Sequence, residues 1–174
     1  ACGLSDIPDS DNRCGVFRGL TSVIKSEVDC KAKQLSASKR INVVFVTTLH
    51  FSASRLCLED HFVAALLHAE PKITWRVGKD SGQPRSRPGV LVDFEQGVFT
   101  KANSILDARQ HLSVVLLGGF GLVPPDACVR GVLHPNPVRS FDPQWLPDIQ
   151  LCRFAEWPPG DHVRIDWLNR PPRA

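Results

Sequence analysis

The chain has 174 residues, of which 43% are hydrophobic and 22% are charged, with a net charge of +3. These values are ordinary for a globular protein, and a chain of this length buries enough surface to build a core without disulfides or metals. The charge is too small to indicate a dedicated nucleic-acid-binding protein, so that role is kept as an alternative and not favoured. No apolar run reaches the ~20 residues of a membrane-spanning helix. We therefore expect one globular domain over 1–174 with no membrane span.

The six cysteines form neither a CxxC pair nor the spacing of a zinc finger. An even number of cysteines favours disulfide bonds and an oxidising, extracytoplasmic location, with the pairing left open. The numbering begins at Ala1-Cys2 and the chain contains no methionine, so we expect a secreted protein whose signal peptide has been removed. The alternative is a cytosolic protein with buried thiols. The candidate disulfide cysteines are Cys2, Cys14, Cys30, Cys57, Cys128 and Cys152.

The first part of the chain predicts an extension, a helix and a strand. Residues 1–14 are polar and rich in turn-forming side chains, which indicates an N-terminal extension. From Val16 to about Ser38, apolar residues recur at intervals of three and four and predict an amphipathic helix, with a buried face formed by Phe17, Leu20, Ile24 and Val28. The run 41–47 (INVVFVT) is almost entirely β-branched or aromatic. Such runs are typical of strands covered on both faces, so we predict a central strand here.

The middle of the chain continues the alternation of helices and strands. Apolar spacing and alternation predict, in order, a helix over 54–69, strands at 72–77 and 90–94, a helix over about 98–110 and a buried strand at 112–117. Between the first two of these strands, residues 78–88 carry no hydrophobic side chain and are expected to form a mobile basic loop.

After residue 117 the expected elements become shorter. They are a short helix over 126–133, an irregular proline-containing stretch over 134–148, a strand at 149–154 and an edge strand at 162–167. Alternating helices and strands favour a three-layer α/β sandwich with a central, mainly parallel sheet, in whose middle 41–47 and 112–117 lie side by side. A two-layer α+β sandwich is the alternative.

The predicted parallel sheet suggests where chemistry would take place, because ligands bind outside the carboxyl ends of parallel strands. His50 follows the first strand, Asp93 and Glu95 lie at the end of the strand at 90–94, and the strand at 112–117 runs into the glycine-rich turn 118–121. A histidine and a carboxylate beside backbone N–H donors have the chemistry of a base, its orienting group and an anion site. His50, Asp93 and Glu95 are therefore candidate catalytic residues. Helix capping, surface exposure and a tight strand exit explain the same residues without catalysis.

Motifs for cofactors and metals are missing from the sequence. The turn 118–121 is neither a dinucleotide-binding nor a phosphate-binding loop, no serine nucleophile elbow occurs, and the histidines do not have metal-ligand spacing. We therefore expect neither a cofactor nor a metal.

Two features favour protein binding. The basic loop presents Lys79, Arg85 and Arg87, and Trp157 precedes two prolines in a rigid turn. Arginine and tryptophan are enriched at binding hot spots, so these four residues are the candidate binding residues. We interpret the chain as a secreted, disulfide-stabilised interaction protein (an effector, an inhibitor or a recognition domain) whose partner is another protein. The alternative function is a small secreted hydrolase of ribonuclease or esterase type that uses His50 with Asp93 or Glu95.

Overall fold

The structure is a computed structural model of the whole chain. It describes residues 13–48, 56–57, 59–68, 71–74, 91–94, 96–101, 104–119, 129–159 and 163–169, with the backbone alone described for 13–18, 71–74 and 91–94. The expected mobile loop 78–88 lies outside these ranges. The expected N-terminal extension 1–14 also lies outside them, except for Arg13 and Cys14, which begin the first helix.

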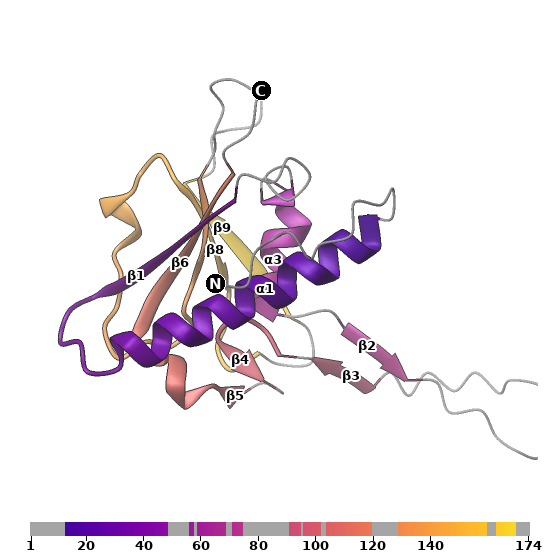
Figure 1. Ribbon diagram of the computed structural model, residues 1–174, viewed down its shortest axis with the longest axis horizontal. Coiled ribbons are helices and arrows are strands. Elements are labelled where there is room, and N and C mark those ends of the chain that lie inside the picture. The colour runs from indigo at the N-terminus through magenta and orange to yellow at the C-terminus, as the bar shows by residue number, and fades with distance from the viewer. Residues whose placement is uncertain are drawn as a thin grey trace, which may run out of the picture.

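Five strands form the main sheet (Figure 1). In spatial order they are β1 (Asn42–Thr48), β6 (Leu112–Gly119), β7 (Arg130–Leu133), β8 (Gln150–Phe154) and β9 (Ile165–Leu168). The β1–β6 and β7–β8 pairs are parallel, whereas β6–β7 and β8–β9 are antiparallel. The sheet is therefore mixed, and the prediction of a mainly parallel sheet is not confirmed. A parallel crossover needs about a dozen residues or more, and the connection 120–129 from β6 to β7 is shorter than that.

Strand β1 lies beside β6 as predicted, but at the edge of the sheet and not in its middle. Val43 and Phe45 are paired in register with Val114 and Leu116, and they remain 39% and 49% exposed. Strand β6 lies inside the sheet, between β1 and β7, and its residues from Leu112 to Gly118 are all buried. The prediction that 41–47 is a central strand is thus wrong, because an apolar β-branched run specifies a strand and not its number of neighbours.

Both long helices pack against the same face of the sheet (Figure 1). Helix α1 (Arg13–Leu35) buries Leu20, Ile24 and Val28, as the spacing of its apolar residues predicts, and α3 (Asp60–His68) adds Phe62 and Leu66 to the same core. The strand residues that meet them include Val115, Leu117, Val132 and Cys152. Because both helices lie on one face, a three-layer sandwich is not confirmed.

The other face of the sheet is covered by the irregular segment 134–149, most of which (134–148) the sequence predicts to lack regular structure. This face presents Val114, Leu116, Leu133 and Leu151, and the segment packs Phe141, Leu146 and Ile149 onto them. Within the segment, residues Pro143–Trp145 form the short 3-10 helix η3. The side-chain amide of Asn169, directly after β9, donates to the carbonyl oxygens of Pro143, Leu146 and Ile149, and so attaches the segment to the sheet.

Two short hairpins lie outside the main sheet. Strands β2 (Pro71–Thr74) and β3 (Leu91–Phe94) pair with each other in antiparallel fashion. Strands β4 (Thr100–Lys101) and β5 (Ser104–Ile105) form the second hairpin, followed by the 3-10 helix η2 (Asp107–Arg109).

Two of the predicted helices are wrong. The helix expected over 98–110 is replaced by the β4–β5 hairpin. The N–H of Val98 donates to the carbonyl oxygen of Leu66, and the N–H of Leu106 donates to that of Phe99, so neither bond belongs to an α-helix. Part of the helix expected over 126–133 is strand β7, which pairs with β6 and β8. In both segments, long-range pairing outweighs a weak local pattern.

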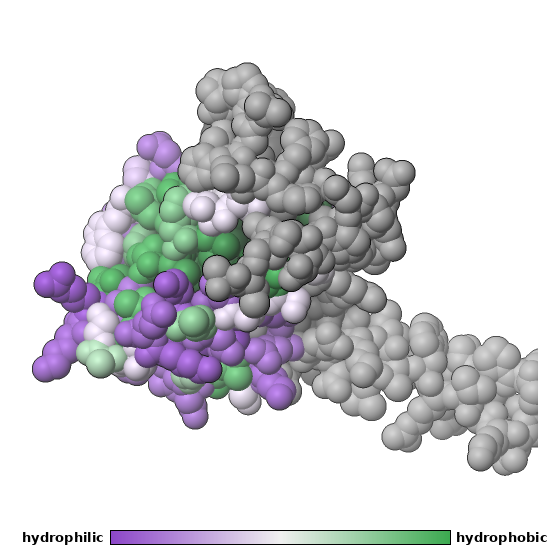
Figure 2. Space-filling view, in the orientation of Figure 1, coloured by the Kyte–Doolittle hydropathy of each residue, from purple (hydrophilic) through white to green (hydrophobic). Residues whose placement is uncertain are grey.

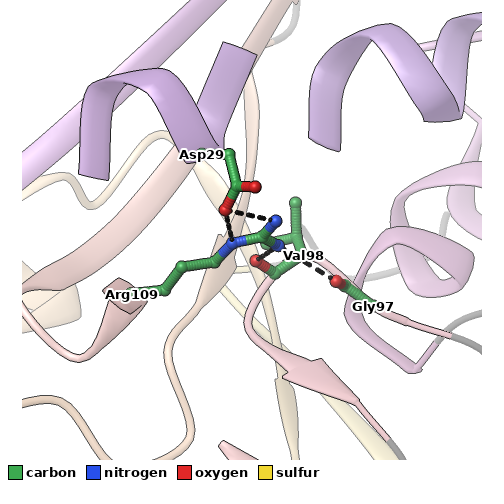
Figure 3. Close-up of polar contacts among 4 residues, drawn as sticks. All are labelled: Asp29, Gly97, Val98 and Arg109. Atoms are coloured by element: carbon green, nitrogen blue, oxygen red, sulfur yellow. Dashed lines mark hydrogen bonds and ion pairs between the residues drawn. The ribbon is translucent and has the colours of Figure 1, made fainter. Parts of the chain in front are cut away.

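The buried side chain of Arg109 connects helix α1 to the backbone at Gly97 and Val98 (Figure 3). The Arg109 side chain is 1% exposed. Its Nε donates to Asp29 Oδ1 at 2.8 Å, and its Nη2 lies 2.7 Å from the same oxygen. Its Nη1 donates to the carbonyl oxygens of Gly97, at 3.2 Å, and Val98. Gly97 has no space for a side chain, since a Cβ there would lie 2.4 Å from the carbonyl oxygen of Leu67.

Replacing Arg109 by Leu should lower the free energy of unfolding by about 3 kcal/mol or more, because buried carbonyl oxygens lose their donors and Asp29 loses its partner. Asp29→Asn should cost less, since Arg109 keeps its bonds to the carbonyl oxygens. Urea unfolding followed by circular dichroism measures both. Arg139→Ala, which removes an exposed side chain, is the control and should change stability by no more than about 0.5 kcal/mol. An Arg109→Leu variant as stable as this control would contradict the role assigned to Arg109.

Candidate functional site

The candidate catalytic residues were expected at the ends of three neighbouring strands. One of these strands, β3, is not part of the main sheet. Asp93 lies in β3, which pairs with β2 and not with the main sheet. Of the three strand ends, only those of β1 and β6 are adjacent, with Thr48 paired to Gly119. His50, Glu95 and the side chain of Asp93 lie outside the described residues. Strand β3 therefore does not share a sheet edge with β1 and β6, and the catalytic grouping of His50, Asp93 and Glu95 stays a prediction from the sequence.

The start of the glycine-rich turn has a packing role. Gly118 is buried in β6, and a Cβ on it would lie 2.7 Å from the ring of Phe45 on the neighbouring strand. The absence of a side chain lets the half-exposed ring of Phe45 lie against the sheet. Phe120 and Gly121 lie outside the described residues.

The structure describes one of the four candidate binding residues. Lys79, Arg85 and Arg87 lie outside the described residues. Trp157 is half-buried, packs against the helix-side core and lies 5.0 Å from Phe154 between ring centroids. The exposed tryptophan of the described chain is Trp145, in η3, which is 56% exposed.

Three of the six cysteine side chains are described, and all three are free thiols. Cys30 is exposed on α1, whereas Cys57 and Cys152 are buried in the helix-side core. Burial raises the pKa of the Cys57 and Cys152 thiols to about 12, with a smaller contribution from the charge of Asp60 at Cys152. Cys2, Cys128 and the side chain of Cys14 lie outside the described residues. No disulfide is therefore seen among the described cysteines.

A groove of about 590 Å³ lies between α1 and the outer edge of β1. One wall is a row of α1 residues at four-residue spacing (Val23, Glu27, Lys31 and Leu35), with Leu20 and Ile24 beside them. The other wall is the strand itself, from Val43 to Thr48. In Figure 2, apolar surface gathers over β1 and is bordered by the hydrophilic surface of α1. The groove is thus an apolar channel along an exposed strand, and we call it the β1 groove.

Among the described residues, nothing protects the edge of β1 from pairing with a further strand in the way that is usual for edge strands. Within the described part of the chain, β6 is its only strand neighbour. Residues 42–48 carry no charge and no proline, and the ladder is regular apart from a shift between Asn42 and Val43. Exposed edge strands normally carry charged residues, prolines or bulges that prevent another strand from pairing with them. An uncharged apolar edge beside an apolar groove is therefore a candidate binding site.

A second cavity, of about 440 Å³, lies at the ends of β7 and β8 and is lined by residues that include His134, Arg153 and Trp157. His134 is 5% exposed, its ring lies 4.6 Å from that of Phe99, and its Nδ1 accepts the N–H of Asn136. Its buried Nε2 has no hydrogen-bond partner. Burial lowers the pKa of His134 to about 4. His134 is thus neutral at physiological pH and poorly suited to be a general acid or base.

Within the described ranges, no group of three or more histidine, cysteine, aspartate or glutamate side chains is placed to hold a metal ion. No helix in the described part of the chain is long and apolar enough to cross a membrane.

The pKa of His134 predicts how stability depends on pH. In the unfolded chain this histidine takes up a proton near its ordinary value of 6.5, and in the folded chain only near 4. The unfolded state therefore binds more protons between these values, and the free energy of unfolding should fall as the pH drops from about 6.5 to about 4. Urea unfolding at several pH values tests this, with His134→Phe and an exposed-histidine variant, His61→Phe, in parallel. An equal slope in wild type and His134→Phe would contradict the prediction.

The three described thiols should differ in reactivity. In the native protein, Cys30 should react with iodoacetamide, whereas Cys57 and Cys152 should react only after unfolding, because they are buried and their raised pKa values leave almost no thiolate. Alkylation with and without denaturant, followed by peptide mass mapping, measures this. Rapid native labelling of Cys57 or Cys152 would contradict the expected burial.

Comparisons with known proteins assign no family to this chain: no family model, no curated protein and no solved structure matches it significantly. Any functional conclusion therefore depends on the geometry described above.

Proposed function

We propose that this protein is a protein-binding domain that takes up an extended segment of its partner along the edge of β1. The observation that carries the proposal is the uncharged, half-exposed strand beside the apolar β1 groove. An edge strand offers unpaired backbone N–H and C=O groups, and addition of a partner strand to such an edge is a common mode of protein recognition.

The side chains around the edge indicate what such a segment would contact. Successive residues of a strand point to opposite faces of the sheet. On the helix side, an added strand would place alternate side chains against Val23 of α1 and against Val44 and Val46 of β1. On the other side, the intervening residues would lie beside Val43 and Phe45, whose exposed area they would cover. A segment with β-branched or aromatic residues on both faces fits this edge best.

A protein partner was also inferred from the sequence. The binding surface that we propose is the edge of β1, and not the loop 78–88 or Trp157. The secreted location and the disulfides remain predictions from the cysteine count. The hydrolase alternative stays a prediction from the sequence, since His50, Glu95 and the side chain of Asp93 lie outside the described residues.

A strand-shaped probe tests the proposal. A fluorescent peptide of residues 41–48 (INVVFVTT), with flanking lysines for solubility, supplies a strand of suitable composition. Fluorescence anisotropy should show saturable binding to the wild-type protein. Phe45→Lys should weaken binding about tenfold or more, which corresponds to about 1.4 kcal/mol, because the added charge has to be desolvated beside the incoming strand.

Controls make the result specific. Ser26→Lys adds the same charge at an exposed position of α1 that does not line the β1 groove, and it should bind the peptide like the wild type. A peptide with proline in place of its central valines should not bind, because it cannot complete the ladder. Absence of saturable binding by the monomeric wild-type protein, or equal binding by Phe45→Lys and Ser26→Lys, would refute the proposal.

A further inference from the structure

We infer that the natural occupant of the β1 edge is strand β1 of a second copy of this chain, paired antiparallel about a two-fold axis that passes beside Phe45. The inference depends on the proposed function, since it names the partner for the same edge. In such a dimer the two sheets join into one, and the two α1 helices lie antiparallel to each other on the same face of it.

The strand matches itself in this arrangement. With the axis at Phe45, each phenylalanine faces its copy, Val44 faces Val46 of the second copy, and Val43 faces Thr47. These are the β-branched and aromatic cross-strand pairs that stabilise antiparallel ladders. Because β1 carries no charge, self-pairing brings no like charges together. A two-fold interface requires such self-complementarity, since the same patch is used by both subunits.

The charges on α1 also match themselves. The row that lines the β1 groove reads Val23, Glu27, Lys31, Leu35. About a two-fold axis midway along this row, Glu27 of each copy faces Lys31 of the other, and Val23 faces Leu35. Within one chain Glu27 and Lys31 form no ion pair with each other, and the Lys31 ammonium donates to Gln34 Oε1 at 3.2 Å instead. Both charged side chains are thus available to a second copy. Binding of an unrelated peptide would not account for the order of a negative and a positive side chain along the groove.

One axis satisfies both matches. Helix α1 ends at Leu35 and β1 begins at Asn42, and the two elements run in opposite directions side by side (Figure 1). Phe45 lies three residues into the strand, about 10 Å at ~3.3 Å per residue. The midpoint between Glu27 and Lys31 lies six residues before the end of the helix, about 9 Å at ~1.5 Å per residue. The two distances agree to about 1 Å, and Glu27, Lys31 and Phe45 line the same groove, so one axis can serve both centres.

The oligomeric state of the full chain tests the inference. Sedimentation velocity over a range of protein concentrations, in the presence of reductant so that exposed Cys30 cannot cross-link two copies, should show a monomer–dimer equilibrium. Phe45→Lys should abolish the dimer, and Val43→Lys serves the same purpose if that variant does not fold. Circular dichroism and thermal unfolding verify folding of each variant.

A charge exchange tests the register. Glu27→Lys and Lys31→Glu each place like charges across the axis twice, and each should raise the dimer dissociation constant about tenfold or more. The double variant Glu27→Lys/Lys31→Glu restores opposite charges and should return the constant to near the wild-type value. Lys33→Glu makes the same change as Lys31→Glu at an exposed α1 position outside the β1 groove, and it should have little effect.

The outcomes separate this inference from the proposed function. A wild-type protein that is monomeric at every concentration overturns the inference, and peptide binding by that monomer leaves the proposed function intact. A monomer that also fails to bind the peptide overturns both. A dimer that persists in Phe45→Lys overturns the interface, and a dimer that is lost in Phe45→Lys but is unaffected by the charge variants overturns the two-fold register.

Discussion

The placement of helix α1 depends on the contact between Arg109 and Asp29. A guanidinium that is almost fully buried has to find partners for its donors, and Arg109 finds them in one carboxylate and two backbone carbonyls. Apolar packing of Leu20, Ile24 and Val28 holds the helix against the sheet but leaves it some freedom to slide and rotate, whereas a hydrogen-bonded ion pair is directional. Residues two apart on a helix point about 200° away from each other. By directing Asp29 toward Arg109, the contact turns Glu27 and Lys31 toward the β1 groove.

The same contact links the β1 groove to the rest of the fold. Arg109 holds the backbone at Gly97 and Val98, which in turn is bonded to the end of α3 through Leu66. The groove therefore has one wall fixed by the sheet register and one wall fixed by this polar network. A preformed groove of this kind lowers the entropic cost of binding an extended strand, because only the incoming segment has to become ordered.

The buried thiols and the buried histidine of the described interior are kept in their uncharged forms. The two buried thiols are kept protonated, and the buried histidine is kept neutral, in each case because burial disfavours the charged form. None of these groups is a ready nucleophile or base at physiological pH. The exposed apolar residues, in contrast, include three in or next to β1 (Ile41, Val43 and Phe45). An uncharged apolar edge carries a risk of aggregation, and an occupied edge removes that risk.

The candidate site shows where prediction from sequence stops. Among the described residues selected from the sequence, Trp157 does not line the β1 groove and Cys57, which does, was selected only as a disulfide candidate, although the strand that forms the groove is predicted almost to the residue. The spacing of Glu27 and Lys31 was available in the sequence, yet it indicates only a solvent-facing side of a helix until the neighbouring strand is known to be an edge. The buried position of Arg109 had no sequence signal, because its partners come from segments 80 and about 11 residues away.

The sequence by itself determined the local elements whose signal is strong: the helix through Leu20, Ile24 and Val28, the two apolar strands, the irregular stretch at 134–148 and the strands that follow it. Side-chain periodicity and β-branching act between residues close in the chain, so they can be read from it directly. Only the tertiary structure decided that the sheet is mixed, that both helices cover one face and that β1 lies at the margin. Strand order and direction depend on contacts between residues far apart in the chain, and the number of neighbours a strand has leaves no mark on its own sequence.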